Sequence, residues 1–235
     1  MPNLTMEKYL NGGSTFLNVN TAHTYLITTS TTFNVPVTGK YLVVLCGGAG
    51  SGASYDTTMK LTSGNSGDIQ AMLIDLTAGE NITVTIGAGG PGVLSNSDGN
   101  RGGITSFGSY FSTKDVDNGG KLNAVVADGG TFKCKSILVN NTVVNSDYSE
   151  YELVPNVIQF DSRFVDGASY GESTTSVKPG GAKSYWANGG KAGRVGTVTP
   201  EAGSLGSGGG GQSQAVGYSA DGGDGVCSIK LVEEY

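Results

Sequence analysis

Glycine is the residue that most constrains this chain, because 40 of its 235 residues are glycine and they gather in blocks. This is more than twice the ordinary usage of about 7%. The blocks follow apolar, β-branched segments, as where residues 47–52 follow residues 41–45. Collagen is excluded, because the chain has six prolines and no sustained Gly triplet. The β-branched and aromatic residues between the blocks indicate an ordered core instead of a disordered chain.

Alternation of apolar and polar residues predicts that the fold is almost entirely β. In the clearest strand, 81–86, three aliphatic side chains share one face and are expected to point into the core between two sheets: Ile82, Val84 and Ile86. Further strands are predicted at 25–28, 32–37, 41–45, 68–76, 104–111, 123–127, 131–140 and 226–232. No window shows a capped helical stripe. The predicted fold is an all-β, antiparallel β-sandwich, jelly-roll-like, with long glycine-rich loops.

The densest glycine block runs from Gly167 to Gly225, with 18 glycines in 59 residues. Two structures are compatible with it. One is a flexible Gly/Ser linker. The other is a polyglycine-II-like array of extended strands with three residues per turn, packed so closely that only glycine fits inside. Aromatic and aliphatic residues inserted at intervals, and the return to a strand at 226–232, favour the ordered array.

Composition excludes several classes of partner and site. The net charge of −6 gives no basic field for phosphate backbones, so no nucleic-acid partner is expected. The first ten residues lack the apolar region of a secretory signal, and no window approaches the roughly 20 apolar residues of a membrane span. The protein is therefore expected to be made in a cytoplasm, without membrane insertion.

Candidate catalytic, cofactor and metal motifs each have a simpler interpretation. Residues 48–52 contain a glycine pattern after a strand, but no helix pattern follows, so a dinucleotide site is not expected. The single histidine, His23, cannot form a His-containing metal cluster alone, and Asp-Gly pairs such as those at 98–99 are explained by turn chemistry. The three widely spaced cysteines are expected to be buried free thiols: Cys46, Cys134 and Cys227. No catalytic residue, metal site or cofactor is predicted.

Four blocks of sequence, in order, resemble the glycine-rich domain of bacteriophage tail-fibre and tail-tip proteins. They are Thr32–Pro36 with the glycines of 47–52, Leu76–Gly90, Gly102–Gly108 and Gly222–Ile229. The resemblance covers roughly residues 25–111 and 167–235. It implies a β-sandwich with glycine-rich excursions at one end, which carry receptor-recognising loops in adhesins of this kind.

The resemblance also suggests how the chain is organised. Residues 1–24 are interpreted as an N-terminal attachment segment, and 25–235 as the glycine-rich domain. A glycine-poor insertion is expected at about 114–164, and this insertion is a second candidate for the binding surface.

The function implied is that of a phage virion protein, a tail-fibre or tail-tip adhesin that binds a host-cell receptor without catalysis. The expected partners are a host surface polysaccharide or outer-surface protein and other virion appendage proteins, with the virion as location. A structural virion component, such as a head fibre or collar protein, is the alternative. A homotrimer is compatible with this class, although no heptad or triple-β repeat supports one.

Large aromatic rings in the glycine-rich region are the candidate receptor-binding residues, because Tyr and Trp are enriched in binding hot spots. The alternative is that they cap the edges of the glycine array. These residues are Tyr170, Tyr185, Trp186 and Tyr218. Adjacent residues of an extended strand point to opposite faces. One ring of the 185–186 pair is therefore expected to anchor in the protein and the other to face the host.

Overall fold

The computed structural model describes residues 23–55, 61–94, 96–122, 199–213 and 217–235, and shorter pieces between 181 and 194. It also describes the backbone of strands at 5–10, 13–18, 136–139, 142–145 and 170–171. Within this part of the chain the fold is all-β and contains no α-helix. No helix in the described part is therefore long and apolar enough to cross a membrane.

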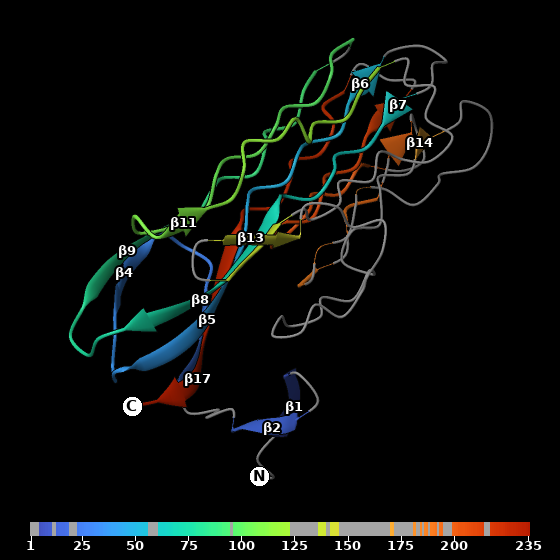
Figure 1. Cartoon of the computed structure of the whole chain (residues 1–235). Helices are drawn as coiled ribbons and strands as arrows, with labels where there is room; N and C mark the ends of the chain where they lie inside the picture. The colour runs from blue at the N-terminus through green and yellow to red at the C-terminus, as the bar shows by residue number, and fades with distance from the viewer. Residues whose placement is uncertain are drawn as a thin grey trace.

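Two sheets form a β-sandwich (Figure 1). The larger has six strands, in the order β13 (Thr142–Asn145), β12 (Ser136–Val139), β8 (Ile69–Leu76), β5 (Gly39–Cys46), β17 (Val226–Glu234) and β3 (Thr24–Ile27). The smaller has four, in the order β11 (Phe111–Ser112), β10 (Ser106–Phe107), β9 (Asn81–Thr85) and β4 (Thr31–Asn34). Neighbouring strands are antiparallel except for the pair β12 and β8, which is parallel.

Shorter pairs complete the described strands. A hairpin joins β1 (Thr5–Leu10) to β2 (Gly13–Asn18), in the segment interpreted from sequence as an attachment region. Elsewhere β14 (Tyr170–Gly171) pairs with β7 (Leu61–Thr62). A three-stranded parallel sheet contains β15 (Gly193–Arg194), β16 (Gln212–Ser213) and β6 (Ser54–Tyr55).

The main core lies between the two sheets and follows the period-2 pattern of the strands. The predicted core positions Ile82 and Val84 are buried there, and Ile86 packs against them, which confirms the prediction for β9. From the larger sheet, the odd-numbered residues of β5 point into the same core: Tyr41, Val43 and Leu45. The even-numbered residues of β5 instead build a second cluster on the other face of the larger sheet.

Two of the cysteines are buried and free, as predicted. Cys227 lies in the main core, where burial raises the pKa of its thiol to about 12. Cys46 lies in the second cluster, and Cys134 lies outside the described residues.

One predicted strand divides into two. The sequence suggested a continuous strand at 104–111, but β10 and β11 are separated by a tight turn at Gly108, whose φ is +51°. The Gly108 N–H donates to the Thr83 carbonyl, and the Tyr110 N–H donates back to the Phe107 carbonyl. A left-handed glycine closes the hairpin. The strand predicted at 123–127 lies outside the described residues.

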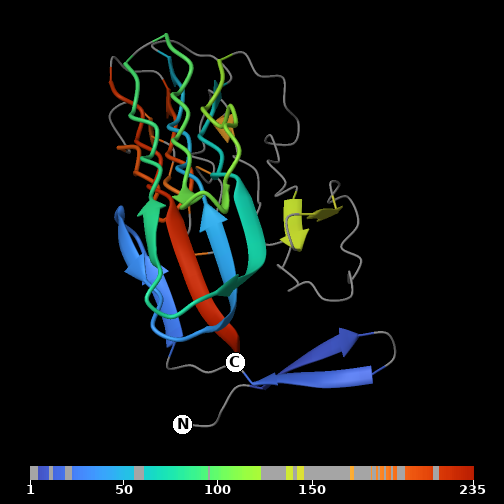
Figure 2. The ribbon, with the colours of Figure 1, turned by 60° about the vertical axis from the view of Figure 1, so that its left-hand side comes forward.

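Glycine-rich segments continue from one end of the sandwich as a bundle of extended chains (Figures 1 and 2). We refer to it as the glycine bundle, made of residues 46–54, 63–68, 86–93, 97–105, 113–121, 190–191, 193, 199–213 and 217–226. Most of its described length belongs to no regular strand. Residues 47–54 are buried along their whole length, although none of their side chains is larger than that of serine.

Successive N–H groups of this central segment donate to three neighbouring segments in strict rotation. Gly47, Gly48 and Ala49 donate to Asp68, Gly103 and Gly223, and the next three residues donate to Asn65, Asn100 and Ala220. Each neighbour is thus contacted again three residues further along. This is the three-residue periodicity expected of polyglycine-II-type strands.

Three other segments donate to the carbonyl groups of the central segment. Gly90, Gly120 and Gly209 donate to Ala49, Ser51 and Gly50. Six segments therefore surround residues 46–54. In the block predicted at 167–225, the described residues 199–213 and 217–225 therefore belong to an ordered array and not to a flexible linker.

Backbone contact explains why these positions are glycine. At Gly48, Gly50 and Gly52, a Cβ atom would overlap a backbone carbonyl of a neighbouring segment. Only a residue without a side chain allows chains to lie this close on six sides.

The first residues of the glycine-poor insertion expected at about 114–164 pack within the bundle. Residues 113–121 belong to the bundle, where Asn118 is completely buried. Its side-chain amide donates to the carbonyls of Gly48 and Ser66, and its Oδ1 accepts from the Gly102 N–H. The bundle therefore accommodates this buried asparagine because its side-chain amide bonds to backbone groups of the neighbouring segments.

Candidate functional site

The end of the glycine bundle away from the sheets is the candidate binding surface, and we call it the tip. It is made by Tyr55, Leu94, Asn96 and Tyr218, which lie where the described bundle segments end. Figure 1 shows β6, which contains Tyr55, at this end, with the C-terminus at the opposite end of the molecule. The tip is thus the part of the bundle furthest from the sandwich core.

Tyr218 is the most exposed large side chain of the tip, with 66% of its surface accessible. Both of its chain neighbours are held in place. The Gly217 carbonyl accepts a 2.8 Å hydrogen bond from the Ser54 hydroxyl, and the Ser219 N–H donates to the Val93 carbonyl at 2.9 Å. The Ser219 hydroxyl in turn accepts from the Val93 N–H. An exposed ring on an immobilised backbone loses little conformational entropy when it binds a partner.

Leu94 and Asn96 form the turn beside Tyr218. Leu94 is 46% exposed, and Asn96 has a φ of +62°, a left-handed conformation that asparagine adopts more readily than most residues. Ser97, which follows Asn96, is joined to Ser54 of the central segment by two backbone hydrogen bonds, at 3.0 and 3.1 Å. The tip therefore presents apolar and amide groups on short, braced turns.

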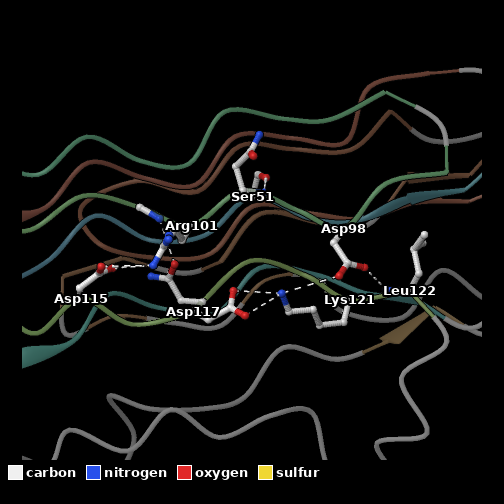
Figure 3. Close-up of polar contacts among 10 residues, drawn as sticks. Ser51, Asp98, Arg101, Asp115, Asp117, Lys121 and Leu122 are labelled. Carbon is white, nitrogen blue, oxygen red and sulfur yellow. Dashed lines mark hydrogen bonds and ion pairs between the residues drawn. The ribbon is translucent and has the colours of Figure 1, made fainter.

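A ladder of exposed ion pairs runs from the tip along one flank of the bundle (Figure 3). Lys121 lies between Asp117 and Asp98, with N–O distances of 2.9 and 3.8 Å. Arg101 pairs with Asp115 at 3.2 Å. Exposed pairs of this kind contribute about 0–1 kcal/mol each. Since the opposite charges alternate, the flank presents no strong field of one sign.

Of the four rings predicted from sequence, the structure describes the side chains of two, Tyr218 and Trp186, and these two lie apart. Tyr218 lies at the tip, and the backbone of Tyr170 pairs with Thr62 in the β14–β7 ladder. Tyr185 lies outside the described residues.

Trp186 lies at the base of the bundle, where its ring packs on the second cluster beside Val44, Cys46 and Val226. The Trp186 N–H donates to the Ser184 hydroxyl. Tyr218 precedes Val226 by eight residues. An extended chain rises about 3.1 Å per residue, so Tyr218 lies roughly 25 Å from Val226 and the Trp186 ring. Trp186 therefore anchors the bundle to the sheet and lies far from Tyr218.

Sequence reasoning missed Tyr55, Leu94 and Asn96. The pair Val93-Leu94 is apolar within a stretch of Gly, Ser and Asn, and this signal could have indicated an exposed turn.

The acidic turns have structural partners. Asp224 Oδ1 accepts the Gly89 N–H at 2.8 Å, and Asp221 Oδ1 accepts the Gly92 N–H. Among the described residues, no group of three or more His, Cys, Asp or Glu side chains is placed to hold a metal ion.

The hydrogen-bonded glycine bundle at one end of the β-sandwich agrees with a comparison with protein families. A family model described as a glycine-rich domain matches residues 27–232. The chain belongs to this glycine-rich domain family. The match includes both sheets and the bundle, and its description names no virion appendage. No curated protein matches the chain.

Proposed function

We propose that this glycine-rich domain protein is a phage virion protein, a tail-fibre or tail-tip adhesin, whose tip binds a receptor on the host surface. The observation that carries the proposal is the exposed Tyr218 ring on a backbone fixed to Ser54 and Val93. The partner is a surface polysaccharide or an outer-surface protein, and the protein binds without catalysis.

The bundle supports this proposal because the residues that stabilise it are different from the residues exposed at its tip. Its interior is stabilised by backbone hydrogen bonds, so the tip residues contribute little to the core. Side chains at the tip can therefore change while the bundle remains intact. Binding residues placed on loops above a rigid scaffold are the usual arrangement in recognition proteins.

Neutral surface chemistry also supports adhesion. Only 14% of the residues are charged, against roughly 25% in typical globular proteins. Tyrosine, leucine and asparagine at the tip combine an apolar contact with hydrogen bonding, which suits both sugar and protein ligands.

The proposal is tested by adding the purified protein to intact host cells before the phage that encodes it. An adhesin binds the cells, and its binding reduces phage adsorption in proportion to occupancy. A structural virion component does neither, and this outcome would contradict the proposed function.

A further inference from the structure

A groove of about 580 Å³ lies on the outer face of the smaller sheet, on the sandwich and away from the tip. Its floor is β9, whose exposed residues Asn81, Thr83 and Thr85 alternate with the buried Ile82 and Val84. The side of the groove is formed by the β10–β11 turn. A volume of this size is within the range of small-molecule sites, about 300–1,000 Å³.

The lining consists mainly of small neutral polar groups. Hydroxyls come from Thr83, Thr85, Ser106 and Ser109, and one amide comes from Asn81. Glu80 is the one charged residue among the described lining residues. Within the part of the chain that the structure describes, the four hydroxyls make no hydrogen bond to protein, so they are available to a ligand.

Two groups at one end of the groove are held in fixed positions. Glu80 Oε1 accepts a 3.1 Å hydrogen bond from the Tyr110 hydroxyl, and Glu80 Oε2 accepts the Thr77 N–H at 3.0 Å. The Tyr110 ring packs on Phe107, with 5.9 Å between ring centroids. Each carboxylate oxygen still has a lone pair for a ligand hydroxyl.

We infer that this groove binds a neutral oligosaccharide. A sugar carries many hydroxyls that both donate and accept, which matches free threonine and serine hydroxyls, an amide and a fixed carboxylate. Because the lining described includes a carboxylate and no cation, an acidic glycan is repelled. The inference does not depend on the tip, since none of the tip residues lines the groove.

The groove is tested by titrating ¹⁵N-labelled protein with neutral dextran and mannan oligosaccharides and, separately, with oligogalacturonate. A single shallow polar site predicts a Kd on the order of 1 mM. The expected result is saturable amide shifts at residues 80–85 and 106–110 with at least one neutral probe, and weaker shifts with oligogalacturonate.

Thr83→Val removes one hydroxyl and keeps the β-branched shape, so the fold is retained. It is expected to raise the Kd roughly three- to tenfold. Thr24→Val is the matched control, because Thr24 is an exposed strand threonine of the other sheet, and it is expected to leave the Kd unchanged.

Three outcomes would overturn the inference: no shifts in the groove with any neutral probe, equal or stronger shifts with oligogalacturonate, or an unchanged Kd for Thr83→Val. Shifts confined to the tip would also overturn it while supporting the adhesin proposal. If the protein binds an oligosaccharide in the groove but does not bind host cells, the result would support the groove as a sugar site and count against the adhesin proposal.

Discussion

Gly50→Ala tests whether close backbone packing holds the glycine bundle together. Gly50 is buried in the central segment, and a Cβ there would overlap the Asn118 carbonyl oxygen. Relief of this overlap requires one segment to move. That movement disturbs two hydrogen bonds of 3.0 Å, from the Gly50 N–H to the Asn65 carbonyl and from the Gly209 N–H to the Gly50 carbonyl.

The expected cost follows from these contacts. Overpacking costs about 1–3 kcal/mol, and each buried hydrogen-bonding group left without a partner adds about 1–3 kcal/mol. With the N–H and the carbonyl of Gly50 both affected, the sum is about 3–9 kcal/mol. In a chain of this size each kcal/mol lowers the Tm by about 2–4 °C, so the Tm is expected to fall by at least about 6 °C.

Gly103→Ala is the matched control within the same bundle. A Cβ at Gly103 would have its nearest neighbour, the Ala88 nitrogen, at 3.2 Å, a fit that needs only a small adjustment. Alanine also lowers the conformational entropy of the unfolded chain, which stabilises the folded state by about 0.4–1 kcal/mol and offsets the cost of that adjustment. Calorimetry should therefore show a Tm close to wild type for Gly103→Ala. A wild-type Tm for Gly50→Ala, or equal losses in both variants, would refute the packing argument.

Other changes test separate parts of the fold. Val84→Asp places an unpaired charge between the sheets and should destabilise by about 3 kcal/mol or more in urea denaturation, whereas unchanged stability would place Val84 outside the core. Mild proteolysis should spare residues 203–211, and rapid cleavage there with the rest intact would favour a linker. Trp186→Ala should lower the Tm and leave cell binding by the folded protein unchanged, because its ring packs on the second cluster. Tyr185→Ala tests the division expected of the 185–186 pair from sequence: cell binding weakened by about 1–3 kcal/mol would extend the binding surface beyond the tip, and parental binding by both variants would remove this pair from it.

Local patterns in the sequence predicted most of the sandwich strands. The alternation in β9 reports directly which face is buried, and the structure follows it residue by residue, whereas β5 is apolar on both faces and both are buried. The β10–β11 hairpin was missed because a positive φ at Gly108 depends on its contact with Thr83, 25 residues away in sequence.

The sequence was sufficient to predict that glycine-rich segments pack closely, but not which segments hydrogen-bond to one another. Glycine content indicates that chains lie close, yet the rotation of Gly47 to Ala49 among three distant segments is a property of the assembled structure. Asn118 shows the same limit, since its amide reaches residues 52 and 70 positions away. The grouping of Tyr55 and Leu94 with Tyr218 likewise depends on contacts between turns that are distant in sequence.

The most direct measurement compares how well the wild-type protein, Tyr218→Ala and Tyr235→Ala block phage adsorption to host cells. Tyr235 is a fitting control, because its ring is 63% exposed at the opposite end of the molecule. Wild type and Tyr235→Ala are expected to block adsorption equally. Tyr218→Ala should fold normally and need a concentration about 10-fold or more higher, as for a hot-spot residue. Equal blocking by all three proteins would remove Tyr218 from the receptor site, and no blocking by the wild-type protein would contradict the adhesin function itself.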